Sequence, residues 1–266
     1  MAVLITDIDH KFLKEDGKGA ASSGNELARS VWSGLNISGE PHARLGNHTN
    51  VSWHFDDFNP FRSADYEIII DTACTVTVTP TGKLKLAVDA SGADDQAGLQ
   101  AINAAAGSGP MIQLTSGKEA AFEARCMIDQ TAATNAFFGV AADGVSSYAV
   151  DVLFAADSAS RGTPDMTGVS ILNTDAGVAD CVHATGASLT IAKESAKTIA
   201  ADTWFNVGLR FDGSDLMFYI DGVQRGDKVA LASLPTTVLA PTFEVKMEGA
   251  VAGNAYVDWY AIGQEV

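Results

Sequence analysis

Basic residues are scarce in this chain. Its 266 residues contain only 17 lysines and arginines against 33 aspartates and glutamates, which gives a formal net charge of −16 at pH 7. The basic residues are scattered, and a negative field of this kind repels phosphate backbones, so nucleic acid is excluded as a partner. The acidity indicates a soluble, self-repelling surface, and the alternative is a set of divalent-cation sites or a cationic partner.

Long hydrophobic runs are also missing. No apolar stretch reaches the length that a bilayer requires, and the first residues do not combine a basic region with an apolar core. These absences predict a protein that does not contact membranes. They also predict that it is made and kept in a cytoplasm, or released from one by lysis.

Cysteine is rare, and familiar catalytic or cofactor motifs are absent. Cys74, Cys126 and Cys181 are far apart and sit in apolar runs, which predicts buried, inert thiols. The five histidines have no neighbours at zinc-ligand spacing. No nucleophile-elbow, phosphate-loop or dinucleotide motif occurs, so the sequence predicts no catalytic residue, no metal ligand and no cofactor.

Residues 203–223 form the most informative stretch of the chain. Trp204 to Phe211 and Leu216 to Ile220 alternate with period two, as half-buried strands do. Asp212-Gly213 and Asp221-Gly222 stand where the chain must reverse, because Asp tolerates left-handed dihedral angles and Gly adopts them freely. The stretch predicts a β-hairpin followed by a second tight turn.

This hairpin pattern resembles the late hairpin of laminin-G and concanavalin A-like jelly rolls. The resemblance implies an all-β fold, an antiparallel two-sheet jelly-roll sandwich. It also implies that Trp204 and alternate apolar residues of the hairpin fill the gap between the two sheets. Residues 61–266 agree, with about twelve to fourteen short strand-like runs and no alternation of strands with helices. Ser91 to Gly109 is predicted as a long connection, with at most one helical turn.

Residues 1–60 are different in character and are predicted to form an extended, contact-making N-terminal arm. The stretch is polar and glycine-rich, with isolated aromatic residues, and cannot bury much surface alone. Its aromatics either dock on another protein or wrap around the chain's own domain. The predicted partner-binding residues are Trp32, Trp53, Phe55, Phe58 and Phe61.

The run Phe122-Glu-Ala-Arg-Cys-Met-Ile128 predicts a strand with two distinct faces. Phe122, Cys126 and their alternate neighbours share one face, which we expect in the core. Glu123 and Arg125 share the other face, where neighbouring strands can pair them. A catalytic role for Glu123 is the weaker alternative.

Three further motifs resemble structural proteins of tailed bacteriophages. They are Asp94-Asp-Gln-Ala-Gly-Leu-Gln100, Gly117-Lys-Glu-Ala-Ala-Phe-Glu-Ala-Arg125 and Ala136-Phe-Phe-Gly-Val140. The resemblance implies a non-enzymatic decoration or cement protein on the capsid surface of a virion, made in the host cytoplasm. Its partner would be the major capsid protein, which it would stabilise by binding only the assembled shell. It would form a homo-oligomer, for which a trimer is the first expectation.

The jelly-roll resemblance also raises glycosidase and calcium-binding roles. Glycosidases with this fold share the motif Glu-x-Asp-x-x-Glu on one strand, and this sequence lacks that motif. Laminin-G-like domains can hold calcium at the rim through aspartates, so calcium is a possible but not expected ligand. The candidate aspartates, among which no spacing selects a set, are Asp143, Asp151, Asp157, Asp175, Asp180 and Asp212.

The alternative function is a lectin-like, carbohydrate-binding module on a virion or tail fibre that attaches to host glycans. It requires exposed aromatic residues with polar neighbours on a sheet face or rim. Trp259 and Tyr260 point to opposite faces of one strand, so both cannot serve fully. The candidate residues are Tyr148, Tyr219, Tyr256, Trp259 and Tyr260.

Overall fold

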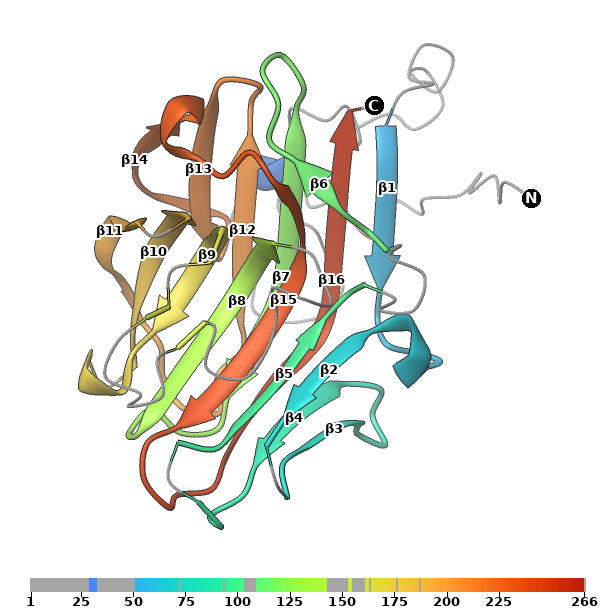
Figure 1. Ribbon diagram of the computed structural model, residues 1–266, viewed down its shortest axis with the longest axis vertical. Helices are drawn as coiled ribbons and strands as arrows, with labels where there is room; N and C mark the ends of the chain where they lie inside the picture. Colours follow the sequence, from blue (N-terminus) through green and yellow to red (C-terminus); the bar gives the residue numbers. More distant parts are fainter. Residues whose placement is uncertain are drawn as a thin grey trace.

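The computed structural model describes residues 29–32, 51–71, 73–92, 94–102, 109–142, 153–154, 161–162, 164–175, 177–186 and 188–265. These residues form two antiparallel β-sheets whose strands overlap in Figure 1. The predicted all-β jelly-roll sandwich is confirmed. No helix among the described residues is long and apolar enough to cross a membrane.

Sheet I contains the chain's C-terminal strand and the predicted hairpin. Its strand order is β14 (Val223–Ala230), β13 (Asp215–Ile220), β12 (Phe205–Phe211), β7 (Ala120–Ile128), β16 (Gly253–Glu265), β4 (Leu84–Val88) and β3 (Thr75–Val78), and β1 (Val51–Asp56) pairs with β16. A short helix, α1 (Arg29–Trp32), packs against β12 and β7 of this sheet.

Sheet II lies on the other side of the core. Its strand order is β11 (Ser188–Thr198), β10 (Val178–Thr185), β9 (Met166–Ile171), β8 (Thr134–Ala142), β15 (Val238–Met247), β5 (Gln96–Gln100) and β2 (Glu67–Ile70), and β6 (Ile112–Gln113) pairs with β15. Three single-turn 3-10 helices complete the described elements: η2 (Ser63–Asp65), η3 (Asn173–Asp175) and η4 (Leu231–Ser233).

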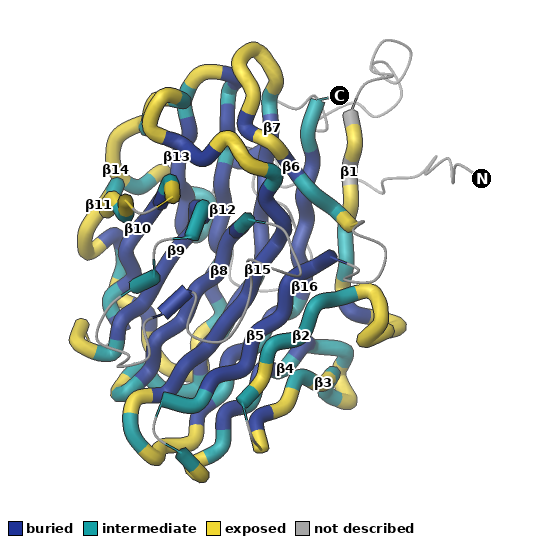
Figure 2. Tube along the Cα trace, in the orientation of Figure 1, coloured by how far each residue is buried: buried dark blue, intermediate teal, exposed yellow. Residues whose placement is uncertain are grey.

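Aromatic side chains from both sheets meet in the core. Phe138 of β8 and Phe205 of β12 contact edge to face, with ring centres 5.6 Å apart. Phe122 of β7 and Phe243 of β15 also meet, at 6.3 Å. All four are at most 2% exposed. Figure 2 shows buried residues along the central strands and exposed residues at the outer strands and turns.

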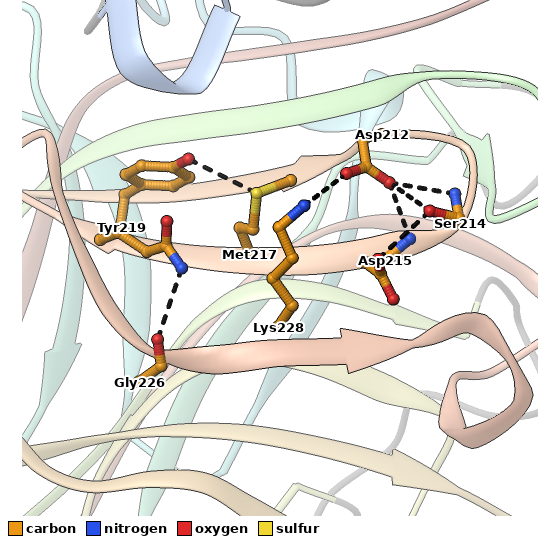
Figure 3. A network of polar contacts seen from close by, with 8 residues as sticks. Asp212, Ser214, Asp215, Met217, Tyr219, Gly226 and Lys228 are labelled. Carbon is orange, nitrogen blue, oxygen red and sulfur yellow. Dashed lines mark hydrogen bonds and ion pairs between the residues drawn. The ribbon is translucent and has the colours of Figure 1, made fainter.

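The predicted hairpin is confirmed by the pairing of β12 with β13, in which Val207 lies opposite Ile220. Asp212 organises its turn: Oδ1 accepts hydrogen bonds from the backbone N–H of Ser214 (3.1 Å) and Asp215 (2.8 Å). Lys228 of β14 donates to Oδ2 at 2.9 Å (Figure 3). Partial burial would raise the pKa of Asp212, but these hydrogen bonds hold it below its usual range.

The structure corrects one element and qualifies another. The predicted connection 91–109 contains strand β5, which pairs with β2 and β15. Its pattern resembled a loop because Gly98 interrupts it and two glutamines flank it, yet all five residues are buried. Within the predicted arm, β1 pairs with β16 and so belongs to sheet I. The domain boundary at residue 60 stays a prediction.

Gly139 of β8 and Gly168 of β9 lie opposite one another and allow a close approach of the two strands. A Cβ at Gly139 would lie 2.4 Å from the carbonyl oxygen of Thr167, and Phe137 Cζ would be 2.9 Å away. Neither neighbour can withdraw freely, because one is backbone and the other is a buried ring.

Gly139→Ala is therefore expected to lower the free energy of unfolding by about 1–3 kcal/mol, as overpacked cores do. The usual effect of alanine in a strand has the opposite sign. Urea unfolding followed by far-UV circular dichroism measures the change, with the exposed Thr77→Ala as control. An unchanged or raised stability would show that the two strands are not in close contact here.

Candidate functional site

The outer face of sheet II is covered in part by the chain itself. Leu153 and Phe154 are each 1% exposed and belong to an apolar cluster with Phe137 of β8. Arg161 forms a β-bridge with Phe154 and donates a hydrogen bond from Nη2 to Asp180 Oδ2 at 2.6 Å. These residues cover the β8–β10 part of this face.

Arg161 and Asp180 form a buried ion pair, with side chains 5% and 4% exposed. Arg161 Nε also donates to Ser170 Oγ at 2.8 Å, and Asp180 Oδ1 accepts from the backbone N–H of Ser195 at 2.7 Å. Both charges therefore have additional hydrogen bonds, which a buried pair requires to be stable. Asp180 is used in this pair and not as a free ligand for calcium.

The outer face of sheet I is divided into two halves. We call the partly exposed part of this face the open half. Its members are Lys83, Arg125, Met127, Trp204, Tyr256 and Asp258. We call the part beneath α1 the covered half, and its members are Ala121, Glu123, Gly208, Met217, Tyr219, Trp259 and Ala261. Figure 1 shows α1 in blue, behind β12 and β7.

A β-bulge in β16 determines which residues reach this face. The register against β7 shifts between Val257 and Trp259, so Asp258 is the extra residue. Val257 and Tyr260 point into the core, while Asp258 and Trp259 both lie on the outer face. Bulges commonly re-aim a side chain in this way.

Asp258 is the centre of the open half. Its carboxylate accepts hydrogen bonds from Lys83 Nζ at 2.7 Å and from Arg125 Nη1 at 2.6 Å. The two cations also lie over the Trp204 ring, with Lys83 Nζ 4.5 Å and Arg125 Cζ 5.0 Å from its centre. Ion pairs and cation–π contacts thus hold Trp204 in a fixed orientation.

Glu123 is the polar centre of the covered half and is 1% exposed. Its Oε2 accepts a hydrogen bond from Trp32 Nε1 at 2.8 Å, and its Oε1 accepts one from Asn206 Nδ2 at 3.3 Å. Val31 of α1 fills the space above Gly208, where an added Cβ would lie 2.5 Å from Val31 Cγ2. The prediction that Glu123 lies on the outer face of β7, away from the core, is confirmed.

The structure packs the described arm aromatics against the chain's own domain. Trp32 and Phe58 are 0% and 1% exposed, and Phe55 stacks on Trp259 with ring centres 6.0 Å apart. Phe61 stacks on Tyr66 at 5.2 Å. The side chain of the remaining predicted anchor, Trp53, lies outside the described residues. Contact with a partner through these five residues stays a prediction, and the burial of Trp32 and Phe58 disfavours it.

Of the residues predicted for glycan binding, Tyr256 alone has a partly exposed side chain among those described. Tyr260 is in the core, and Tyr219 and Trp259 are buried beneath α1. The position of Tyr148 lies outside the described residues. The expectation that Trp204 fills the gap between the sheets is wrong, because Trp204 is partly exposed and its position directly before the core residue Phe205 directs it outward.

The calcium candidates do not gather in the described part of the chain. Asp175 is exposed, Asp212 is paired with Lys228, and Asp143, Asp151 and Asp157 lie outside the described residues. One group of potential ligands within the described ranges is Cys74, Asp89 and Asp95. A sulfur ligand does not suit calcium, which binds oxygen.

Comparisons with solved structures identify the class of fold. A β-glucanase from Bacillus licheniformis superposes with a TM-score of 0.54 at 10% identity, over 79% of this chain and 97% of that one. Peanut lectin gives 0.54 at 11%, over 80% and 97%. An endo-acting O-glycanase of the human gut microbiota gives 0.54 at 13%, over 79% and 97%. No protein-family model and no curated protein matches the chain.

The chain thus has the concanavalin A-like jelly-roll fold that lectins and glycoside hydrolases share. This corrects the expectation of a non-enzymatic protein. Several of the superposed structures are glycoside hydrolases, so the fold is one that supports catalysis. At these identities the likeness shows the fold alone, and function must be argued from the site.

The buried pair on sheet II gives a testable prediction. Asp180→Asn leaves the Arg161 guanidinium buried without its anionic partner, which is expected to lower the free energy of unfolding by about 3–5 kcal/mol. The matched control is Asp212→Asn, which neutralises the more exposed pair with Lys228, keeps an oxygen acceptor for the turn and is expected to lose much less. Unfolding in guanidinium chloride measures the free energy of unfolding of both variants. Equal decreases in the two variants would contradict the buried character of the pair that Arg161 forms with Asp180.

Proposed function

We propose that this protein binds carbohydrate, in the manner of a lectin, on the open half of sheet I. The observation that carries the proposal is the pair of partly exposed aromatic side chains, Trp204 and Tyr256, on one sheet face beside an anchored carboxylate. Aromatic rings present an apolar surface, while neighbouring charged groups form hydrogen bonds, and sugars display both kinds of surface.

The backbone positions of the two aromatic residues suit an extended ligand. Tyr256 lies opposite Met127 of β7, and Trp204 directly precedes β12, the next strand across. Two strand spacings correspond to about 9–10 Å. Met127 lies on β7, the strand between the two residues, and adds a flexible apolar side chain to this face. The face therefore offers two partly exposed aromatic residues in a row across the sheet.

The polar groups of the open half are held in place before a ligand arrives. Asp258 is oriented by Lys83 and Arg125, so its carboxylate has a fixed direction beside the two cations. Such preorganisation lowers the entropic cost of binding. Sugar hydroxyl groups donate and accept hydrogen bonds, so they match this mixed set.

Trp204→Ala is expected to weaken glycan binding by about tenfold or more, because it removes an aromatic anchor. A glycan array that includes mixed-linkage glucans, mucin O-glycans and galactosides selects the ligand, and calorimetry then gives the affinity. Ile191→Ala, an exposed apolar residue on β11, is the control. Equal affinity of Trp204→Ala and the unchanged chain would refute this site.

A place on the surface of a virion stays a prediction from the sequence resemblance. All three motifs on which it rests fall on strands, namely β5, β7 and β8. Such strand residues characterise the fold and do not indicate where the protein is located. Carbohydrate binding is compatible with that place, since it would attach the particle to host glycans. If a variant that no longer binds glycans, such as Trp204→Ala, still binds an assembled capsid shell, the result would instead favour the decoration role.

Glycoside hydrolysis is a second candidate because this face holds two carboxyl groups on adjacent strands. Asp258 of β16 faces two cations, whereas Glu123 of β7 is buried with an indole and an amide donor. Glycosidases use a pair of carboxyl groups with different roles. New reducing ends released from the glycan ligand, and lost in Glu123→Gln and Asp258→Asn, would support it. A rate unchanged by either substitution would contradict it.

A further inference from the structure

The covered half and the open half form one continuous surface on the same strands. Glu123 and Arg125 are alternate residues of β7, and Asn206 of β12 lies directly opposite Arg125. Gly208, the next outward residue of β12, lies opposite Glu123. A ligand that extends along β7 from the open half would therefore reach Glu123 after Arg125, with α1 in its path.

The surface beneath α1 has the composition of a binding site. Small residues form its floor, and larger aromatic residues stand on both sides: Tyr219 on β13 and Trp259 on β16. The residues of the floor, which leave room for an occupant, are Ala121, Gly208 and Ala261. An acceptor, the Glu123 carboxylate, lies in the middle of this floor.

Trp32 occupies this surface as a ligand would. Its ring is fully buried there, and its N–H donates to Glu123 Oε2, while Asn206 holds the other oxygen. A sugar hydroxyl group can donate the same hydrogen bond, and the apolar face of a sugar can stack on the same aromatic walls. The polar group that orients Trp32 is thus one that a glycan can use.

We propose that the covered half is the second half of one glycan-binding surface, and that Trp32 of α1 is its exchangeable intramolecular occupant. This proposal rests on the proposed function of the open half. Short glycans bind beside α1. Longer glycans displace Trp32 and take over its hydrogen bond to Glu123, so the N-terminal segment tunes the length of ligand that the protein selects.

Calorimetry with gluco-oligosaccharides, from the disaccharide to the hexasaccharide, tests the proposal in the full-length chain. Trp32→Ala is expected to bind the hexasaccharide about fivefold more tightly than the unchanged chain, because a competing occupant is removed. The disaccharide should bind equally to both. Trp32→Phe keeps a ring but loses the donor, so a smaller gain is expected, and it serves if Trp32→Ala fails to fold. Phe61→Ala removes an arm aromatic elsewhere and should change neither affinity.

Equal or weaker hexasaccharide binding in both Trp32 variants would overturn the proposal. A second probe separates it from the proposed function. N-acetyltryptophanamide carries the indole without a sugar, and it should bind saturably to Trp32→Ala and shift the NMR signal of the Asn206 side-chain amide. If it binds while no glycan binds any variant, the exchange of Trp32 is supported and the proposed function is refuted. If it does not bind, the exchange is refuted.

Discussion

The pairing of β7 with β16 is the constraint on which the rest of sheet I depends. β16 runs from Gly253 to Glu265 and also pairs with β4 and with β1, so it joins four strands into one surface. The bulge at Asp258 lies within this pairing and places Asp258 and Trp259 on the same outer face. Without it, alternation would direct Trp259 into the core, and the face would lose a wall of its covered half.

The sequence was sufficient to predict the architecture. Alternation in Phe122–Ile128 assigned both faces of β7 correctly, and the Asp-Gly pairs located the turns of the hairpin, because these signals are local. Strand β5 was missed because its alternation consists of only two apolar residues, Ala97 and Leu99, with Gly98 between them and a glutamine at each end. Its burial comes from pairing with β2 and β15 and from the core, and none of these contacts can be read from the five residues themselves.

The candidate site was much less predictable. Trp204, Lys83 and Asp258 are far apart in sequence, and the pairing of their strands brings them together. The arm aromatics were expected either to bind a partner or to pack on the chain's own domain, and Trp32 donates a hydrogen bond to a buried carboxylate of its own chain. A spacing rule detects neither arrangement, because both depend on which strands become neighbours. The absence of one glycosidase motif likewise could not decide enzymatic activity, since it tests a single arrangement of carboxylates.

The chain contains only four tryptophans, so their indole N–H signals give a direct test of where a glycan binds. The measurement is a titration of the nitrogen-15-labelled, full-length chain with the glycan selected on an array, followed by NMR. The account predicts that the Trp204 indole signal shifts and saturates with the affinity found by calorimetry. A glycan that binds while the Trp204 signal stays fixed would place the ligand elsewhere and contradict the central claim.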